Sequence, residues 1–308
     1  MTDIQSDLDR AYSPSVWSHR ISDPEKVIES HLQTISQATE HAQKTIPCLL
    51  NWPIEPNTLL SDYGIDLYLP WFSDGELLNL DSIKPKAIFV YIHGGYWQFL
   101  SRKENGFMAQ TMSDEQIVTA VIGYPIAPHA TMEQIISCVE HGLVKIVKWA
   151  MKLSVKVFVA GHSAGAHLAA TTLLIDWERK YNIPCEIFGG FFLISGVFDL
   201  IPLVSTYVNK QIGMTIDTAK HSSPIWRAGD EYNKDIKDVI VLCVHAEHDP
   251  PCFHEQNQNY ASYLEKIGFT KIKMIRLDHF DHFDVIEQLE NRDQPLTLLI
   301  LNLIKESI

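Results

Sequence analysis

The stretch VKVFVAGHSAGAHLAA, residues 155–170, decides the fold of this chain. Its first six residues are a mostly apolar run that predicts a buried strand, and the small residues Ala166–Ala170 predict a helix. Between them lies the pattern G-x-S-x-G, made by Gly161, Ser163 and Gly165. In the order strand, sharp turn, helix, such a serine is held as a nucleophile on a strained turn. The glycines suit this turn because a Cβ on either would clash where strand and helix come close.

A serine hydroxyl is a poor nucleophile unless a base takes its proton and a carboxylate orients that base. With a serine on such a turn, the acid is expected downstream and the histidine after it. Residues Val239–Val244 predict a second buried strand, which ends in the segment HAEHDPP, 245–251. Asp249 is the expected orienting acid, because it lies at the carboxyl end of a late strand. Glu247 is its competitor, and simple capping of a helix that starts near Phe253 is the alternative role for Asp249.

Two histidines are candidates for the base. Residues Lys271–Leu277 alternate as a last strand, and Val285–Leu289 begin a helix. His279 and His282 lie in the loop expected between them, from which a side chain can reach back over the sheet to Ser163. His282 is preferred because it sits just ahead of the helix, on the more constrained backbone. The other histidine is then expected at the surface or in a supporting role.

A glycine pair marks the fourth part of the expected site. Residues Ala87–Ile92 form a near-continuous apolar run, typical of a buried parallel strand, and HGGYWQ, residues 93–98, follows directly. Glycines after a strand let the backbone turn its N–H groups toward one point. Together with the N–H of Ala164, those groups would stabilise the negative oxygen of a tetrahedral intermediate. The alternative interpretation is an ordinary Gly-Gly turn.

Taken together, five motifs resemble those of the kynurenine formamidase (arylformamidase) family, α/β-hydrolases related to the hormone-sensitive-lipase group of esterases. They are HGGYWQ (93–98), GHSAGAHL (161–168), SGVFDL (195–200), AEHD (246–249) and DHFD (281–284). The resemblance runs from about Leu8 to the C-terminal helix, and Gly-Gly-Tyr-Trp-Gln is its most specific element. In this chain Asp-His-Phe occurs twice, at 278–280 and 281–283, where the family pattern is expected to have it once.

The resemblance implies a reaction, the hydrolysis of N-formyl-L-kynurenine to L-kynurenine and formate. It also implies that Ser163, Asp249 and His282 form a catalytic triad, and it favours His282 over His279. Neither a cofactor nor a metal is implied. The expected partner is a small-molecule substrate, and the resemblance suggests a homodimer.

The same resemblance implies that Gly94, Gly95 and Tyr96 form the loop that presents the oxyanion donors, opposite Ala164. Tyr96 and Trp97 are candidates for packing against the aromatic ring of the substrate. A plain core or rim role is the alternative for both aromatic side chains.

Composition is typical of one enzyme domain. The chain has 308 residues, of which 46% are hydrophobic, enough for one large α/β core. We expect a single α/β-hydrolase domain over residues 1–308, with a cap-like insertion at about 201–238, a stretch without clear strand character. The net charge of −13 argues against nucleic acid or an anionic membrane as a partner.

Several features favour a cytoplasmic location. The start, MTDIQSD, lacks the basic residues and apolar centre of a signal peptide. The longest apolar segment, Leu296–Ile304, is too short to span a bilayer. The five cysteines include no C-x-x-C pair, so the sequence indicates neither a disulfide framework nor a zinc ribbon. His245, His248 and Asp249 lie close together but lack the helical His-Glu-x-x-His arrangement of zinc sites, so no metal is expected.

Elsewhere, expected helices and strands alternate along the chain. Helices are expected over 8–44 (with breaks near Pro14 and Pro24), 104–112 and 131–153, and strands over 65–69, 117–124 and 189–194. This alternation predicts a mostly parallel central sheet with helices on both faces.

Two other functions are compatible with these motifs. The first is a broad carboxylesterase of the same superfamily, which the serine turn and the triad do not exclude. The second is a binding protein built on an inactive hydrolase. Such proteins usually lose the serine or the histidine, and both are present here.

Overall fold

The computed structural model describes residues 6–54, 63–71, 80–227 and 234–308. In this part of the chain, eight strands form one sheet in the order β1-β2-β4-β3-β5-β6-β7-β8. Their bounds are β1 Cys48–Pro53, β2 Gly64–Tyr68, β3 Ala87–Ile92, β4 Ile117–Ile122, β5 Lys156–His162, β6 Phe188–Ile194, β7 Ile240–His248 and β8 Ile272–Asp281. Only β2 runs against its neighbours, β1 and β4, and all other pairs are parallel.

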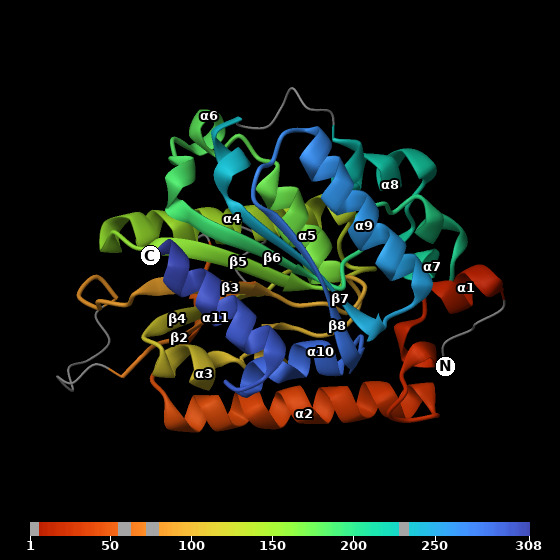
Figure 1. The fold of residues 1–308 in the computed structure, drawn as a ribbon, viewed down its shortest axis with the longest axis horizontal. Coiled ribbons are helices and arrows are strands. Elements are labelled where there is room, and N and C mark those ends of the chain that lie inside the picture. The colour runs from red at the N-terminus through yellow and green to blue at the C-terminus, as the bar shows by residue number, and fades with distance from the viewer. Residues whose placement is uncertain (1–5, 55–62, 72–79, 228–233) are drawn as a thin grey trace.

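Helices cover both faces of the sheet (Figure 1). One layer contains α4 (Met132–Leu153), α5 (Ala164–Leu173) and α9 (Pro251–Lys266), and the opposite layer contains α2 (Pro24–Thr45), α3 (Ala109–Asp114) and α11 (Pro295–Ser307). The shorter segments are α1 Asp7–Ala11, η1 Pro14–Trp17, η3 Arg102–Glu104, α6 Trp177–Tyr181, η4 Cys185–Ile187, α10 Asp284–Glu287 and η8 Gln288–Glu290. The expected mostly parallel sheet with helices on both faces is confirmed.

The sequence of strand β3 is apolar throughout because both faces of the strand are buried. Ile88, Val90 and Ile92 point into the core beneath α4 and α5, whereas Phe89 and Tyr91 belong to the core beneath α2 and α11. Because successive side chains of a strand point to opposite faces, a strand covered on both sides needs apolar residues at every position. Because β3 pairs in parallel with both β4 and β5, the carboxyl ends of these three strands lie side by side.

Helix α4 begins and ends where its sequence predicts. Thr131 and Gln134 form a capping box at its start, and Ser154 ends it in a left-handed conformation with φ 55°. Among the described helices none is long and apolar enough to cross a bilayer.

The structure differs from the expected elements in several places, one of which is β7, expected to end at Val244 and observed to continue to His248. Strand β1 was not expected, and it adds an antiparallel edge through its pairing with β2. The helix expected over 104–112 is replaced by η3 and the shorter α3. Gly106 lies between them and packs against the Tyr68 ring, where a Cβ would lie 2.3 Å from the ring. Strand β8 continues past Leu277 to Asp281, where it pairs with His248 of β7.

The segment expected to form a cap contains short helices and no strand among its described residues. They are η5 Pro202–Ser205, α7 Asn209–Ile212, α8 Ile216–Ser222, η6 Pro224–Trp226 and η7 Lys234–Asp238, and residues 228–233 lie outside the described part. The N-terminal segment packs against it, since the Tyr207 amide donates to the Asp9 carboxylate at 2.7 Å. Its role as a cap over the site stays a prediction.

Candidate active site

Ser163 lies in the sharp turn between β5 and α5. Its backbone has φ 55° and ψ −119°, a conformation that a residue with a Cβ rarely adopts. The turn is held because the Ser163 amide donates to the carbonyl of Ile194 on the neighbouring strand β6 at 2.8 Å. Strain of this kind persists only where the surrounding structure imposes it, and it is common at nucleophiles.

The glycines on both sides of Ser163 are required by close approach of the backbone. A Cβ on Gly161 would lie 2.2 Å from the carbonyl oxygen of Gly165. A Cβ on Gly165 would lie 2.0 Å from the carbonyl oxygen of Ile92 on β3. Both distances are shorter than any real contact, so the expected steric reason for the two glycines is confirmed.

Asp249 and His282 lie in contact. His282 Nδ1 lies 2.6 Å from Asp249 Oδ1, and both side chains are buried. The second carboxylate oxygen of Asp249 accepts hydrogen bonds from the Ser195 hydroxyl at 2.6 Å and from the Ala246 amide at 2.8 Å. Helix α9 begins at Pro251 and its cap position, Pro250, makes no side-chain cap bond, so Asp249 does not cap this helix.

The structure separates the competing acids and histidines into two pairs. Glu247 accepts a hydrogen bond from the backbone N–H of His279 at 2.8 Å. The His279 side chain, near the end of β8, is 91% exposed, whereas the side chains of Asp249 and His282 are buried. His279 therefore lies within the strand and not in the loop expected from the sequence, because β8 continues to Asp281.

His282 lies beside the turn that carries Ser163. His162 Nε2 donates to the backbone carbonyl of His282 at 2.8 Å, and the two imidazole rings are 4.6 Å apart. Burial, followed by the neighbouring His282, lowers the pKa of His162 well below its usual value, so His162 is neutral and serves as a hydrogen-bond donor. Phe253 and Phe283 pack edge-on against the His282 ring.

No hydrogen bond joins Ser163 to His282 in the described part of the chain. None of the hydrogen bonds there involves the Ser163 hydroxyl, and those of His282 go to His162 and Asp249. Because Nδ1 of His282 is engaged by Asp249, Nε2 is the ring nitrogen left for proton transfer. Hydrogen bonds between nucleophile and base are often long without substrate and tighten when it binds.

The glycine loop after β3 lies against Ser163. Gly95, Tyr96 and Trp97 all have positive φ, at 95°, 48° and 58°, which turns successive N–H groups to one side. A Cβ on Gly94 would lie 3.3 Å from the Cβ of Ser163. In the described part of the chain, the amides of Gly94, Gly95, Tyr96 and Ala164 donate to no acceptor. This arrangement suits the binding of an oxyanion at the serine.

The two aromatic residues of this loop differ in exposure. Trp97 is fully buried in the core, where its indole packs edge-on against His167 at 5.1 Å. Tyr96 is only partly buried, and its hydroxyl donates to the Tyr12 carbonyl at 2.8 Å. Tyr96 is thus the member of the pair with surface available to a solute, and contact of either with substrate stays a prediction.

Ser195 belongs to the site, although its sequence motif did not predict a role for it. It follows β6, the strand between the one that carries Ser163 and the one that carries Asp249. Its φ of 48° and its amide bond to Val244 at 2.7 Å fix the backbone, and its hydroxyl holds Asp249. The sequence feature that could have pointed to Ser195 is its position directly after a strand of the central sheet.

An N-terminal arginine holds the loop that carries His282. Arg20 Nε donates to Asp281 Oδ2 at 2.9 Å, and Nη1 donates to Glu287 at 3.0 Å. The Ser18 hydroxyl donates to the same Asp281 oxygen at 2.5 Å. Burial alone would raise the pKa of Asp281, but the hydrogen bonds from Arg20 and Ser18 outweigh it and hold this pKa below its usual range. In the second Asp-His-Phe copy, residues 281–283, Arg20 therefore binds Asp281 and Asp249 binds His282.

We expect Arg20→Ala to lower the free energy of unfolding by about 2–4 kcal/mol, because it leaves the buried Asp281 without its cation. This range takes into account that Arg20 is partly exposed, so solvent weakens the ion pair. The part of this loss that comes from Asp281 should be present above about pH 4, since a carboxylate with a lowered pKa stabilises the fold when ionised and loses that effect as the pH falls further. A freer His282 should also lower kcat by about 10- to 100-fold. Thermal unfolding and steady-state kinetics measure both effects.

Arg276→Ala is the matched control. Arg276 pairs with Asp278 at 2.7 Å on the same strand, but both side chains are more than half exposed, at 53% and 56%. Loss of such an exposed pair should cost less than about 1 kcal/mol and leave kcat unchanged. Equal behaviour of the two arginine variants would contradict the anchoring role of Arg20.

Arg102 and Lys103, two cations close in sequence to the glycine loop, differ in their partners. Arg102 is bound to the buried Asp66 at 2.9 Å and to Asn51 at 2.9 Å, and Lys103 is exposed in η3.

In the described residues, no group of three or more His, Cys, Asp or Glu side chains is arranged to hold a metal ion.

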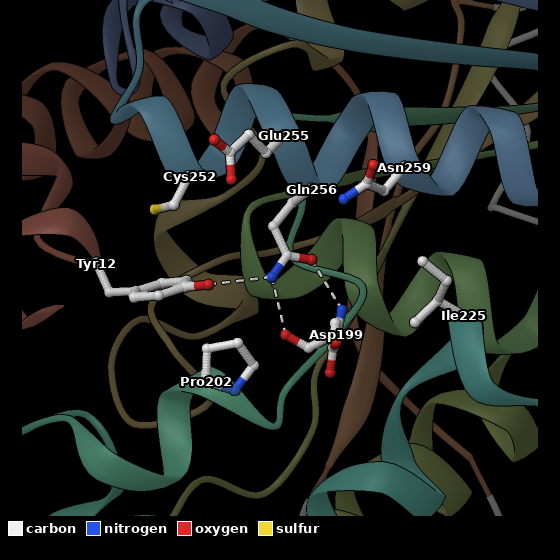
Figure 2. A pocket seen from close by; sticks show the side chains of 8 residues that line it. All are labelled: Tyr12, Asp199, Pro202, Ile225, Cys252, Glu255, Gln256 and Asn259. Carbon is white, nitrogen blue, oxygen red and sulfur yellow. Dashed lines mark hydrogen bonds between the residues drawn. The ribbon is translucent and has the colours of Figure 1, made fainter.

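A cavity of about 150 Å³ lies beside the first half of α9 (Figure 2). Figure 2 shows Gln256 at its centre, where the side-chain amide bonds to the backbone N–H and carbonyl of Asp199 at 2.8 and 2.9 Å. Its lining residues are Tyr12, Asp199, Pro202, Ile225, Cys252, Glu255, Gln256 and Asn259. Ser163, Asp249 and His282 are not among these lining residues, although Cys252 directly precedes Phe253, whose ring lies 5.0 Å from that of His282.

The fold and the site define an α/β-hydrolase. A family model described as alpha/beta hydrolase fold matches residues 89–230. The solved structure of an esterase from Pyrobaculum calidifontis superposes with a TM-score of 0.68, at 17% identity, over 96% of this chain and 98% of that chain.

Two curated relatives indicate one family within the α/β-hydrolases. The chain is 36% identical over 303 residues to kynurenine formamidase of Salmo salar, covering 98% of this chain and 97% of that protein. It is 34% identical over 309 residues to kynurenine formamidase of Danio rerio, with the same two coverages. The chain belongs to the kynurenine formamidase family, and the resemblance seen in the sequence is confirmed.

Proposed function

We propose that this enzyme hydrolyses N-formyl-L-kynurenine to L-kynurenine and formate, with Ser163, His282 and Asp249 as its catalytic triad. The observation that carries the proposal is the 2.6 Å contact between His282 and Asp249, beside a serine held at φ 55°. Membership of the kynurenine formamidase family supports the substrate.

In the first step, Ser163 Oγ attacks the formyl carbon while His282 Nε2 takes the hydroxyl proton. Asp249 stabilises the imidazolium that forms, and Ser195 and the Ala246 amide keep that carboxylate in place. The carbonyl oxygen becomes negative and accepts from the amides of the 94–96 loop and of Ala164. One such donor contributes roughly 3–4 kcal/mol to lowering the barrier.

In the second step, the tetrahedral intermediate collapses and the bond between the formyl carbon and the aryl nitrogen breaks. His282 gives its proton to that nitrogen, which leaves as the amine of L-kynurenine. Formyl-Ser163 remains, and His282 then takes a proton from water, which attacks the formyl carbon. Collapse of the second intermediate releases formate and returns the proton to Ser163, so the enzyme is restored without a cofactor.

A comparison of substrates tests the proposed specificity. We expect kcat/KM for N-formyl-L-kynurenine to exceed that for N-acetyl-L-kynurenine by more than about 100-fold, since the formyl group carries only hydrogen and a tight acyl pocket rejects an added methyl group. The amine product is the same for both substrates, so one absorbance assay measures both rates.

The main alternative is a broad carboxylesterase. It predicts efficient hydrolysis of p-nitrophenyl acetate with little turnover of N-formyl-L-kynurenine, the reverse of our expectation. The other alternative, a binding protein on an inactive hydrolase fold, predicts that a fluorophosphonate fails to label Ser163.

The proposal places the enzyme in the cytoplasm, as a homodimer. All five cysteines lie in the described part of the chain, where no disulfide joins any two of them, which suits a reducing compartment. Light scattering coupled to size-exclusion chromatography measures the oligomeric state directly.

A further inference from the structure

Tyr124 follows β4 and reaches the loop after β3. The two strands are parallel, and Ile92 lies opposite Ile122, so the residues just after each strand meet at the same edge of the sheet. The Tyr124 hydroxyl lies 2.7 Å from the carbonyl oxygen of His93 and 3.2 Å from that of Gly94. Its ring is stacked on the His93 imidazole, with centroids 4.0 Å apart and planes at 9°.

These two carbonyls decide where the neighbouring N–H groups point. A peptide group is planar and trans, so its N–H points away from its C=O. The His93 carbonyl shares a peptide with the Gly94 amide, and the Gly94 carbonyl shares one with the Gly95 amide. A hydroxyl that holds both carbonyls on one side therefore turns both amides to the other side.

We infer that Tyr124 is a positioning residue, whose hydroxyl aims the Gly94 and Gly95 amides at the oxyanion formed on Ser163. The inference rests on the serine mechanism proposed above. Neither amide has an acceptor among the described residues, and the loop lies against the Cβ of Ser163. His93 adds a second hold on the Gly94 carbonyl through Nδ1 at 3.0 Å.

The hydroxyl keeps its proton at any pH at which the enzyme works. Tyr124 is 4% exposed, and burial raises its pKa well above the usual value. Burial also lowers the pKa of His93 to about 4, so its imidazole is neutral and its Nδ1–H stays a donor. The anchor is thus made of two neutral donors, which hold the loop without placing a positive charge near Ser163.

Tyr124→Phe tests the inference, because it keeps the ring stack and removes only the oxygen. We expect kcat to fall by about 10- to 100-fold, less than the loss of a whole oxyanion donor, while KM changes by less than about threefold. The rate of labelling by a fluorophosphonate should fall by a similar factor, because its phosphoryl oxygen occupies the same position as the oxyanion. The rates are calculated per labelled site, so misfolded protein does not contribute.

Tyr260→Phe is the matched control. Tyr260 is also fully buried, and its hydroxyl bonds to a backbone carbonyl, that of Ala170 at 3.4 Å, outside the oxyanion loop. This variant should lower the melting temperature while kcat and the labelling rate stay within about twofold.

Labelling does not depend on the formamide substrate, so an enzyme that is labelled but does not hydrolyse N-formyl-L-kynurenine would refute only the proposed substrate. The inference is overturned if Tyr124→Phe labels and turns over within twofold of wild type, if only KM changes, or if Tyr260→Phe loses as much kcat.

Discussion

Ser163→Ala is expected to lower kcat for N-formyl-L-kynurenine by about 10⁴- to 10⁶-fold. The variant has no nucleophile to form the formyl-enzyme, and what remains is the rate enhancement from substrate binding and the oxyanion donors. The Ser163 hydroxyl makes no hydrogen bond with the described residues, so its removal should change the free energy of unfolding by less than about 1 kcal/mol. A large kinetic loss with an unchanged melting temperature is therefore the expected combination.

Fluorophosphonate labelling followed by peptide mapping identifies the nucleophile directly. Wild type should be labelled at one site, the peptide that contains residue 163, and Ser163→Ala should not be labelled. Ser154→Ala is a suitable control, since Ser154 also has φ 55° but is an exposed helix cap. Labelling of Ser163→Ala at another serine, or kcat above about 1% of wild type, would refute the assignment.

His282→Ala and His279→Ala should differ by several orders of magnitude in kcat. His282 is buried on Asp249, so its loss removes the base and leaves a buried carboxylate without its partner. We expect a fall in kcat of about 10⁴- to 10⁶-fold, with slower fluorophosphonate labelling, because Ser163 then has no group to take its proton. His279 is 91% exposed and contacts Glu247, so His279→Ala should stay within about threefold of wild type.

The two histidine variants control for each other, because they lie three residues apart in the same repeated motif. Melting temperatures show whether His282→Ala is still folded, since an unpaired buried carboxylate lowers stability. Kinetics are then compared well below the lower of the two melting temperatures. Equal losses of kcat in both variants, or a loss confined to His279→Ala, would defeat the assignment of His282 as the base.

Local sequence was enough to predict the core of the fold. Apolar runs at 87–92 and 155–160 predict strands buried on both faces, and such strands need helices above and below. Gly161 and Gly165 likewise predict the serine turn, because only glycine fits where backbone meets backbone. The apolar runs and the pattern G-x-S-x-G are themselves short, so they can be recognised in the sequence, although the backbone that Gly165 meets belongs to Ile92 on β3.

Element boundaries were predicted less well, because they depend on partners distant in sequence. Strand β8 continues past Leu277 since β7 offers it a partner as far as His248. Strand β1 exists because β2 presents an edge, although β1 has no alternating pattern of buried residues.

The sequence by itself determined the serine, its glycines and the order of acid and histidine, because these are properties of short segments. Only the tertiary structure decided which acid meets which histidine, through Asp249 with His282 and Glu247 with His279. It also brought in supporting residues from other strands and from the N-terminus: Ser195, Tyr124 and Arg20. Hydrogen bonds act over about 3 Å in space, whatever the separation along the chain, so no spacing in the sequence could have predicted the contacts of these three supporting residues.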